Sequence, residues 1–203
     1  MRVGVLALQG GFALHLDALA RLGVDAIELR AAGQVEALDG LVLPGGESGA
    51  MLRLLDRPLE DALRRHAAAG KPTLATCAGL ILAASEVRPA QPSFGWLDVA
   101  VARNGWGRQV HSAERRADDG RPITLIRAPR VTRVGPGVSV EMTLDGEPVL
   151  VRAGAIWGAT FHPELDDEPW LHRRVFAAPL YSGSIGSTAR SSASQRSRHR
   201  ARE

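Results

Sequence analysis

The chain has one cysteine, Cys77, at a position where a thiol could act as a nucleophile. Cys77 follows the apolar run 72–76 and precedes the apolar run 78–82, which predicts a sharp turn between a buried strand and a helix. Such a turn tolerates only small residues two positions before and after the nucleophile, here Ala75 and Gly79. The positive end of the helix would favour the thiolate. The alternative is a buried structural cysteine.

A candidate base and its orienting carboxylate stand together in the segment Phe161-His162-Pro163-Glu164. In an extended chain residues i and i+2 face the same way, so Glu164 can accept from one ring nitrogen of His162 while the other faces a nucleophile. The histidine would take the thiol proton and the carboxylate would fix its tautomer. An isolated His-x-Glu is more often a surface histidine, but with Cys77 it predicts nucleophilic catalysis.

Two loops could hold the substrate of such a nucleophile. Gly45 and Gly46 follow the apolar run 40–43, and their small size lets backbone N–H groups approach a ligand. The amides of Gly46 and Ala78 are therefore predicted to meet a tetrahedral oxyanion, although a simple tight turn is the alternative. Arg103 and Arg127 could bind a substrate carboxylate through their guanidinium groups, whereas most surface arginines bind none.

The elements that must position these residues alternate between strand and helix in the first half of the chain. This alternation predicts a parallel sheet covered on both faces. From residue 97 onward the short β-like runs are expected to join the same sheet, some of them antiparallel. The expected strands are 2–8, 25–29, 40–43, 72–76, 97–102, 122–127, 130–134, 138–144, 147–152 and 155–160, and the expected helices are 12–22, 51–69 (interrupted near Pro58) and 168–178.

Length and charge indicate one domain with an appendage. The 203 residues are 45% hydrophobic and carry a net charge of +3, from 25 Lys and Arg against 22 Asp and Glu. Residues 182–203 hold five of the arginines and one glutamate, so residues 1–181 carry 20 − 21 = −1. We expect a domain over 1–180 and a disordered Ser/Arg-rich tail over 181–203. Because the excess positive charge lies only in this tail, and five arginines in a disordered segment bind polyanions weakly, we expect no nucleic-acid partner.

The sequence contains neither a long apolar run nor a convincing secretory signal, which predicts a cytoplasmic protein without a membrane partner. A single cysteine rules out an intramolecular disulfide and a multi-cysteine metal site. We expect no metal and no cofactor.

Six motifs together resemble one family. They are LALQGG (6–11), LPGGES (43–48), TCAGLIL (76–82), RNGWGRQ (103–109), IRAP (126–129) and FHPEL (161–165). Their order and spacing over about residues 1–176 are similar to those of the glutaminase subunit of pyridoxal 5′-phosphate synthase, the PdxT/SNO family of class I glutamine amidotransferases.

The resemblance implies an α/β fold, three-layered and flavodoxin-like, with a mixed, mainly parallel sheet and helices on both faces. It implies hydrolysis of L-glutamine to L-glutamate and ammonia through a γ-glutamyl thioester, with Cys77 as nucleophile, His162 as base and Glu164 as its orienter. The positions that match the family's glutamine-binding residues are Gly46, Glu47, Ser48, Arg103, Ile126 and Arg127.

The resemblance also implies a partner. In the family, ammonia passes to a separate (β/α)8-barrel synthase subunit that makes the vitamin B6 cofactor by lyase chemistry, in an assembly of twelve plus twelve subunits. Here Ala75, Trp106, His111 and Ala113 depart from the family's usual residues, and a polar stretch follows Pro179 where relatives continue an apolar helix. Two alternatives remain: a class I glutaminase subunit of another synthase and, because of the altered C-terminus, a non-catalytic binding subunit.

Overall fold

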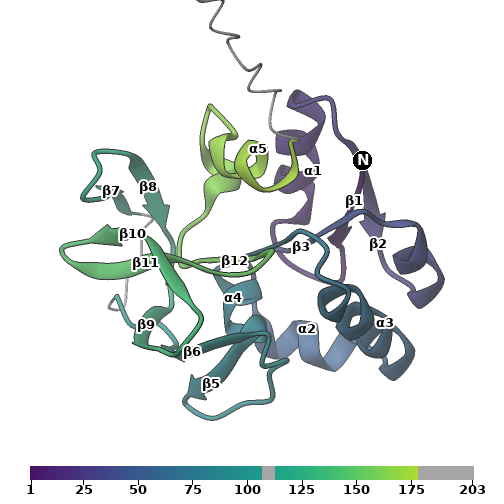
Figure 1. Ribbon diagram of the computed structural model, residues 1–203, viewed down its shortest axis with the longest axis horizontal. Helices are drawn as coiled ribbons and strands as arrows, with labels where there is room; N and C mark the ends of the chain where they lie inside the picture. The colour runs from purple at the N-terminus through teal and green to yellow at the C-terminus, as the bar shows by residue number, and fades with distance from the viewer. Residues whose placement is uncertain (107–112, 178–203) are drawn as a thin grey trace, which may run out of the picture.

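A seven-stranded sheet with strand order β10-β11-β12-β4-β3-β1-β2 forms the centre of the computed structural model, which describes residues 1–106 and 113–177 (Figure 1). Five of its strands are parallel, namely β1 (Arg2–Leu6), β2 (Asp25–Leu29), β3 (Gly40–Leu43), β4 (Thr73–Thr76) and β12 (Ile156–Ala159). Two antiparallel strands, β10 (Ser139–Leu144) and β11 (Glu147–Ala153), extend the sheet beyond β12. The predicted mixed, mainly parallel sheet is confirmed.

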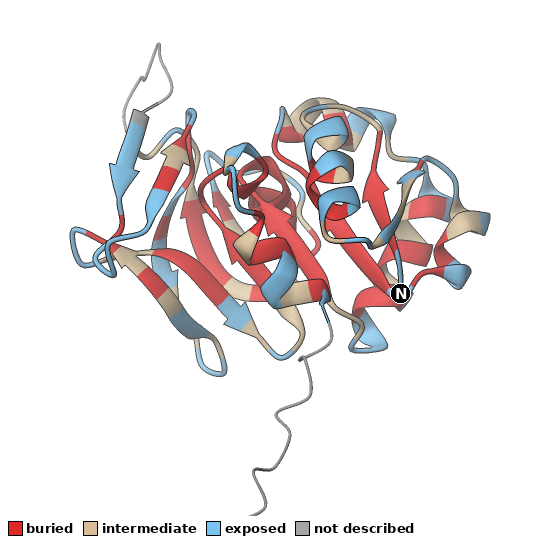
Figure 2. Cartoon of the chain, turned by 90° about the horizontal axis from the view of Figure 1, so that it is seen from above, coloured by how far each residue is buried: buried red, intermediate tan, exposed pale blue. Residues whose placement is uncertain are grey.

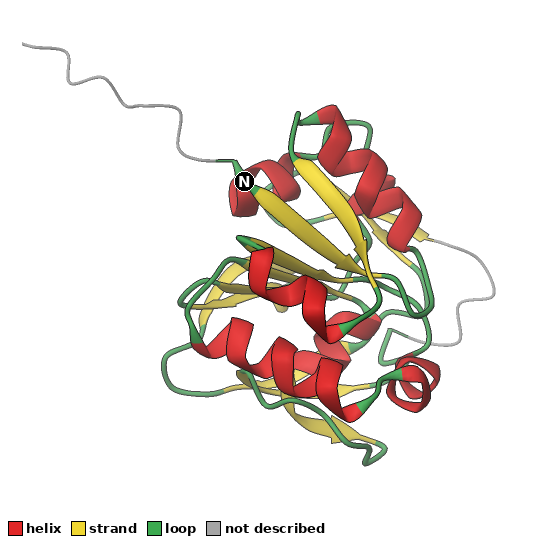
Figure 3. Cartoon of the chain, turned by 90° about the vertical axis from the view of Figure 1, so that its right-hand side faces the viewer, coloured by secondary structure: helices red, strands yellow, loops and turns green. Residues whose placement is uncertain are grey.

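Helices cover both faces of this sheet (Figure 3). One face packs against α1 (Phe12–Arg21) and α5 (Trp170–Phe176), and the other against α2 (Ser48–Leu54), α3 (Arg57–Ala68) and α4 (Ala78–Ala83). Two short 3-10 helices, η1 (Ala32–Ala37) and η2 (Pro163–Leu165), lie in the connections. The three layers expected from the sequence are therefore present.

Two hydrophobic cores lie on opposite faces of the sheet because neighbouring residues of a strand point in opposite directions. In β3, Val42 packs with Leu19 of α1 in one core, whereas Leu41 and Leu43 pack with Leu63 of α3 in the other. The central strands are accordingly buried along most of their length (Figure 2). This burial fixes where each strand ends, and thus where the loops that follow the strands meet.

The expectation that all later strands join the central sheet is wrong. The predicted strand 97–102 forms β6 (Leu97–Ala102) and 130–134 forms β9 (Arg130–Val134), but both belong to a separate three-stranded sheet with β5 (Ala84–Arg88). The predicted strand 122–127 becomes β8 (Pro122–Leu125), which pairs with β7 (Ala113–Arg116) in a separate two-stranded sheet. Alternating side chains indicate a strand but not its partner, because pairing is decided by contacts distant in sequence.

Element ends differ modestly from expectation. The helical stretch predicted at 51–69 is two helices, α2 and α3, and α2 begins at Ser48 because the Glu47 carboxylate accepts a hydrogen bond from the Ala50 amide. The strands β5 and β7 were not among the predicted elements. The expected tail over 181–203, like His111, lies outside the described residues. Within the two described ranges, the helices lack the length and apolar character needed to span a bilayer.

Candidate active site

Cys77 sits at the predicted corner between β4 and α4. Its backbone adopts φ 47° and ψ −102°, a region that a non-glycine residue occupies only when its surroundings hold it there. The Cys77 amide donates to the Ala159 carbonyl of the neighbouring strand at 2.8 Å, which anchors the corner to the sheet. Gly79 is required because a Cβ there would overlap the Leu43 carbonyl oxygen.

His162 and Glu164 form the hydrogen-bonded pair expected from the sequence. His162 Nδ1 lies 2.7 Å from Glu164 Oε1, and both side chains are buried. The pair is produced by the turn of η2 that begins at Pro163, and not by the extended chain that we expected. The carboxylate holds Nδ1, so Nε2 is the nitrogen left to face another group.

The loop after β3 brings the base and the thiol together. A Cβ on Gly45 would lie 2.9 Å from His162 Nδ1 and 3.4 Å from the Cys77 Cβ, so Gly45 packs against both residues. The Gly11 amide donates to the Gly45 carbonyl at 2.9 Å. Gln9 fixes the next peptide, because its Oε1 accepts from the Glu47 amide at 2.7 Å. The loop that contains Gln9 thus holds the candidate oxyanion segment in place.

A cavity of about 200 Å³ opens at these residues. The candidate residues that line it are Gly46, Glu47, Ser48, Cys77, Arg103, Ile126, Arg127 and His162. Ile81 and Asn104 also line it but were not proposed as site residues, although both belong to motifs that carry the family resemblance. Glu164 lies behind His162, and Ala78 is buried at the start of α4, so neither lines the cavity.

Two charged side chains that line the cavity, Arg103 and Glu47, form an ion pair. Arg103 Nη2 lies 3.0 Å from Glu47 Oε1, and the other Glu47 oxygen caps α2. The hydrogen bond from the Ala50 amide, with Arg103 nearby, lowers the pKa of Glu47. Ser48 donates to Gln91 Oε1 at 3.1 Å, a contact that the sequence alone did not suggest. A glutamate, an arginine and a serine thus present a polar rim suited to an amino acid.

The buried charges favour an ion pair between base and thiol. Burial lowers the pKa of His162, but the nearby Cys77 and Glu164 outweigh it and raise this pKa to about 10. Burial raises the pKa of Glu164, but His15 and His162 outweigh it and lower this pKa. Glu164 is therefore a carboxylate at neutral pH, and an imidazolium at His162 would be stabilised beside a thiolate. No cluster of metal-binding side chains occurs among the residues that the structure describes.

The fold is that of the class I glutamine amidotransferases. A crystal structure of a glutamine amidotransferase matches with a TM-score of 0.80 and 43% identity, over 85% of this chain and 96% of that one. A glutamine amidotransferase from Thermotoga maritima, only 14% identical, matches with a TM-score of 0.55 over 85% of this chain and 81% of that one. This second likeness shows the fold alone.

The chain belongs to the SNO glutamine amidotransferase family, because the sequence model of this family matches residues 5–178. It is 44% identical over 192 residues to pyridoxal 5′-phosphate synthase subunit PdxT of Koribacter versatilis, covering 92% of this chain and 99% of the relative. The PdxT subunit of Thermotoga maritima is 41% identical over 181 residues, covering 85% and 96%. The family resemblance inferred from the six motifs is confirmed.

Proposed function

We propose that this chain is the glutaminase subunit of a pyridoxal 5′-phosphate synthase and releases ammonia from L-glutamine. The observation that carries the assignment is that Cys77 and His162 line one cavity with all six positions that match the family's glutamine-binding residues. The relatives that cover nearly the whole chain are synthase subunits by name, which supports the identity of the synthase.

Glutamine binding follows from the charges at the cavity. Arg103 and Arg127 are the cations that bind the α-carboxylate, and Glu47 is the anion that binds the α-amine. Glu47 already pairs with Arg103, so the two side chains hold each other in position before glutamine arrives. This arrangement directs the side-chain carboxamide toward Cys77.

The chemistry then proceeds through a thioester. The Cys77 thiolate attacks the carboxamide carbon, and backbone amides of Gly46 and Ala78 meet the oxyanion. His162, protonated and held by Glu164, gives its proton to the nitrogen as the C–N bond breaks and ammonia leaves. Neutral His162 next takes a proton from water, whose oxygen attacks the thioester carbon. Cleavage of the C–S bond releases glutamate and restores the thiolate.

The partner is a separate (β/α)8-barrel synthase subunit, which consumes the ammonia by lyase chemistry in an assembly of twelve plus twelve chains in the cytoplasm. Ile126 is 36% exposed at the cavity, and Leu165 is 43% exposed just after the candidate base and carboxylate. These apolar side chains are suited to contact with a docking subunit.

The test measures ammonia release from glutamine with the synthase subunit present. We expect Cys77→Ala to lower the rate by about a thousandfold or more, since the nucleophile is removed. His162→Gln should also abolish most activity, whereas the matched control His66→Gln, a buried histidine outside the cavity, should retain it.

A glutamine-mimicking electrophile, diazo-oxo-norleucine, should label Cys77 and block release. Parental activity in Cys77→Ala would overturn the assignment of the nucleophile. A lack of association with the synthase subunit would overturn the assignment of the synthase while leaving the glutaminase chemistry open to the same assay.

A further inference from the structure

Two buried histidines, His15 and His172, lie behind the Glu164 carboxylate. The proposed thioester chemistry uses neither of them. His15 belongs to α1 and His172 to α5, and both have 0% of their surface exposed. His15 Nδ1 lies 2.8 Å from His172 Nε2. On its other side, His15 Nε2 lies 3.4 Å from Glu164 Oε2 and 3.2 Å from Thr76 Oγ1. His15 thus bridges α5 and the carboxylate that holds the candidate base.

The hydrogen positions on the two rings follow from their surroundings. If His15 carried its proton on Nδ1, its Nε2 lone pair would face a buried carboxylate, and His172 would need its proton on Nδ1. His172 Nδ1 has no hydrogen-bond partner within the described residues, and a buried N–H without an acceptor is costly. If both rings instead carry the proton on Nε2, His172 donates to His15, and His15 donates toward Thr76 and Glu164.

We propose that His15 is a positioning residue whose Nε2–H holds the second oxygen of the Glu164 carboxylate, and that His172 fixes the tautomer required for it. The role depends on the proposed function, because Glu164 acts there through His162. Glu164 Oε2 is buried and forms no hydrogen bond of standard geometry among the residues that the structure describes, and His15 Nε2, 3.4 Å away, is placed to supply the missing donor. A carboxylate held at both oxygens cannot rotate away from His162.

The charges around Glu164 agree with a neutral donor at His15. Burial lowers the pKa of His15, although Glu164 opposes this effect, so the ring carries one proton at neutral pH. The titratable and charged groups that act on this cluster are His162 on the segment of Glu164, Asp166 after η2, Arg21 of α1, His172 of α5 and Cys77 after β4. Without this donor the Glu164 carboxylate could rotate away from His162, which would reduce its stabilisation of the imidazolium beside the thiolate.

The test replaces His15 in the full chain by Asn or by Gln, whose carboxamide side chains differ in length. The Gln side-chain nitrogen can reach the place of His Nε2, whereas the Asn nitrogen reaches only the place of Nδ1. The readout is the rate of alkylation of Cys77, the single cysteine, by iodoacetamide as a function of pH. We expect His15→Asn to move the midpoint of this pH profile upward by about one unit, which is a roughly tenfold loss of alkylation rate at pH values below both midpoints. His15→Gln should recover most of this rate.

The control is His66→Asn, the same substitution at a buried histidine of α3 that lies outside this cluster, and its midpoint should not move. An unchanged midpoint in His15→Asn, or a shift in His15→Gln as large as in His15→Asn, would overturn the role of His15. Thermal unfolding of each variant verifies that it is folded at the temperature of the assay.

Ring nitrogen chemical shifts in ¹⁵N-labelled protein test the tautomer directly. We expect the proton on Nε2 in both His15 and His172, and a proton on Nδ1 of His15 would overturn the inference. Neither measurement requires glutamine turnover or the synthase subunit. A failure of the proposed glutaminase activity would therefore be recognised separately from a failure of the positioning role.

Discussion

At the scale of single residues, the site depends on backbone that only small side chains permit. Cys77 is held at a positive φ, and the turn closes because Gly79 lets α4 approach the end of β3. Gly45 has the same function beside the base, since a larger side chain would collide with the His162 ring. The reactive groups are therefore placed by close backbone contacts as much as by their own hydrogen bonds.

Gly79→Ala tests this dependence. The new methyl group would overlap the Leu43 carbonyl, which is backbone and cannot move alone, so we expect a loss of about 1–3 kcal/mol in the free energy of unfolding. The rate of Cys77 alkylation should also fall, because the corner must shift. Urea unfolding measures the first effect. Gly33→Ala is the matched control, since a Cβ there meets no atom within 4 Å, and equal losses in both variants would contradict the steric account.

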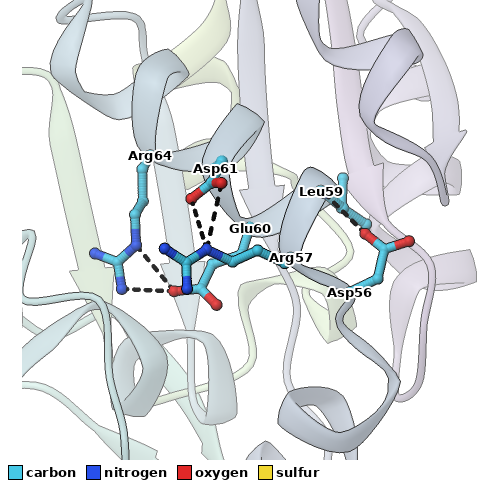
Figure 4. A network of polar contacts seen from close by, with 6 residues as sticks. All are labelled: Asp56, Arg57, Leu59, Glu60, Asp61 and Arg64. Carbon is cyan, nitrogen blue, oxygen red and sulfur yellow. Dashed lines mark hydrogen bonds and ion pairs between the residues drawn. The ribbon is translucent and has the colours of Figure 1, made fainter.

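At the scale of elements, two of the helices on one face, α2 and α3, begin at carboxylates that have different roles. Asp56 caps α3 by accepting from the Leu59 amide at 2.8 Å (Figure 4). Glu47 caps α2 in the same way, but its second oxygen faces Arg103 at the cavity. The start of α2 is thus linked to the candidate binding site, whereas Asp56 is not among the residues that line the cavity.

Asp56→Ala should lower the free energy of unfolding by about 1 kcal/mol, because the Leu59 amide loses its acceptor. Urea unfolding measures this loss, and glutaminase activity should be retained. The control is Asp61→Ala on the same helix, which removes only an exposed ion pair with Arg57 (Figure 4). That change should cost less than about 0.5 kcal/mol. A larger loss at Asp61 than at Asp56 would contradict the capping role.

At the scale of the whole molecule, histidines are buried on both sides of the central sheet. His172 lies on the side of α1 and α5, and burial together with His15 lowers its pKa to about 3. His66 lies on the side of α3, and burial together with Lys71 lowers its pKa to about 4. The folded protein therefore keeps both rings neutral under mildly acidic conditions.

Acid should destabilise the protein for this reason. Below about pH 6.5 the unfolded chain binds protons at His66 and His172 while the folded protein does not, so the stability present above that pH is lost as the pH falls toward 4. Each ring contributes a slope of about 1.4 kcal/mol per pH unit. Urea unfolding between pH 6.5 and 4.5 measures the total slope. His66→Leu should reduce it by one ring's share, and an unchanged slope would contradict the buried neutral state of His66.

Features that neighbouring residues encode could be predicted from the sequence. The Cys77 corner was predicted because a strand, a small-residue turn and a helix are continuous in the chain, and the His162–Glu164 pair because the two residues are separated by one. The strands of the central sheet followed from apolar runs that must be buried. These features depend on local backbone geometry, which a short segment specifies.

Contacts between residues distant in the sequence became known only from the folded chain. Strands β6 and β9 were recognised, but their separate sheet was not, since pairing depends on competing contacts across the fold. The contact between Ser48 and Gln91, and the lining of the cavity by Ile81 and Asn104, were missed for the same reason. His15 and His172 are 157 positions apart, and their contact behind Glu164 exists only because α1 and α5 pack on the same face of the sheet.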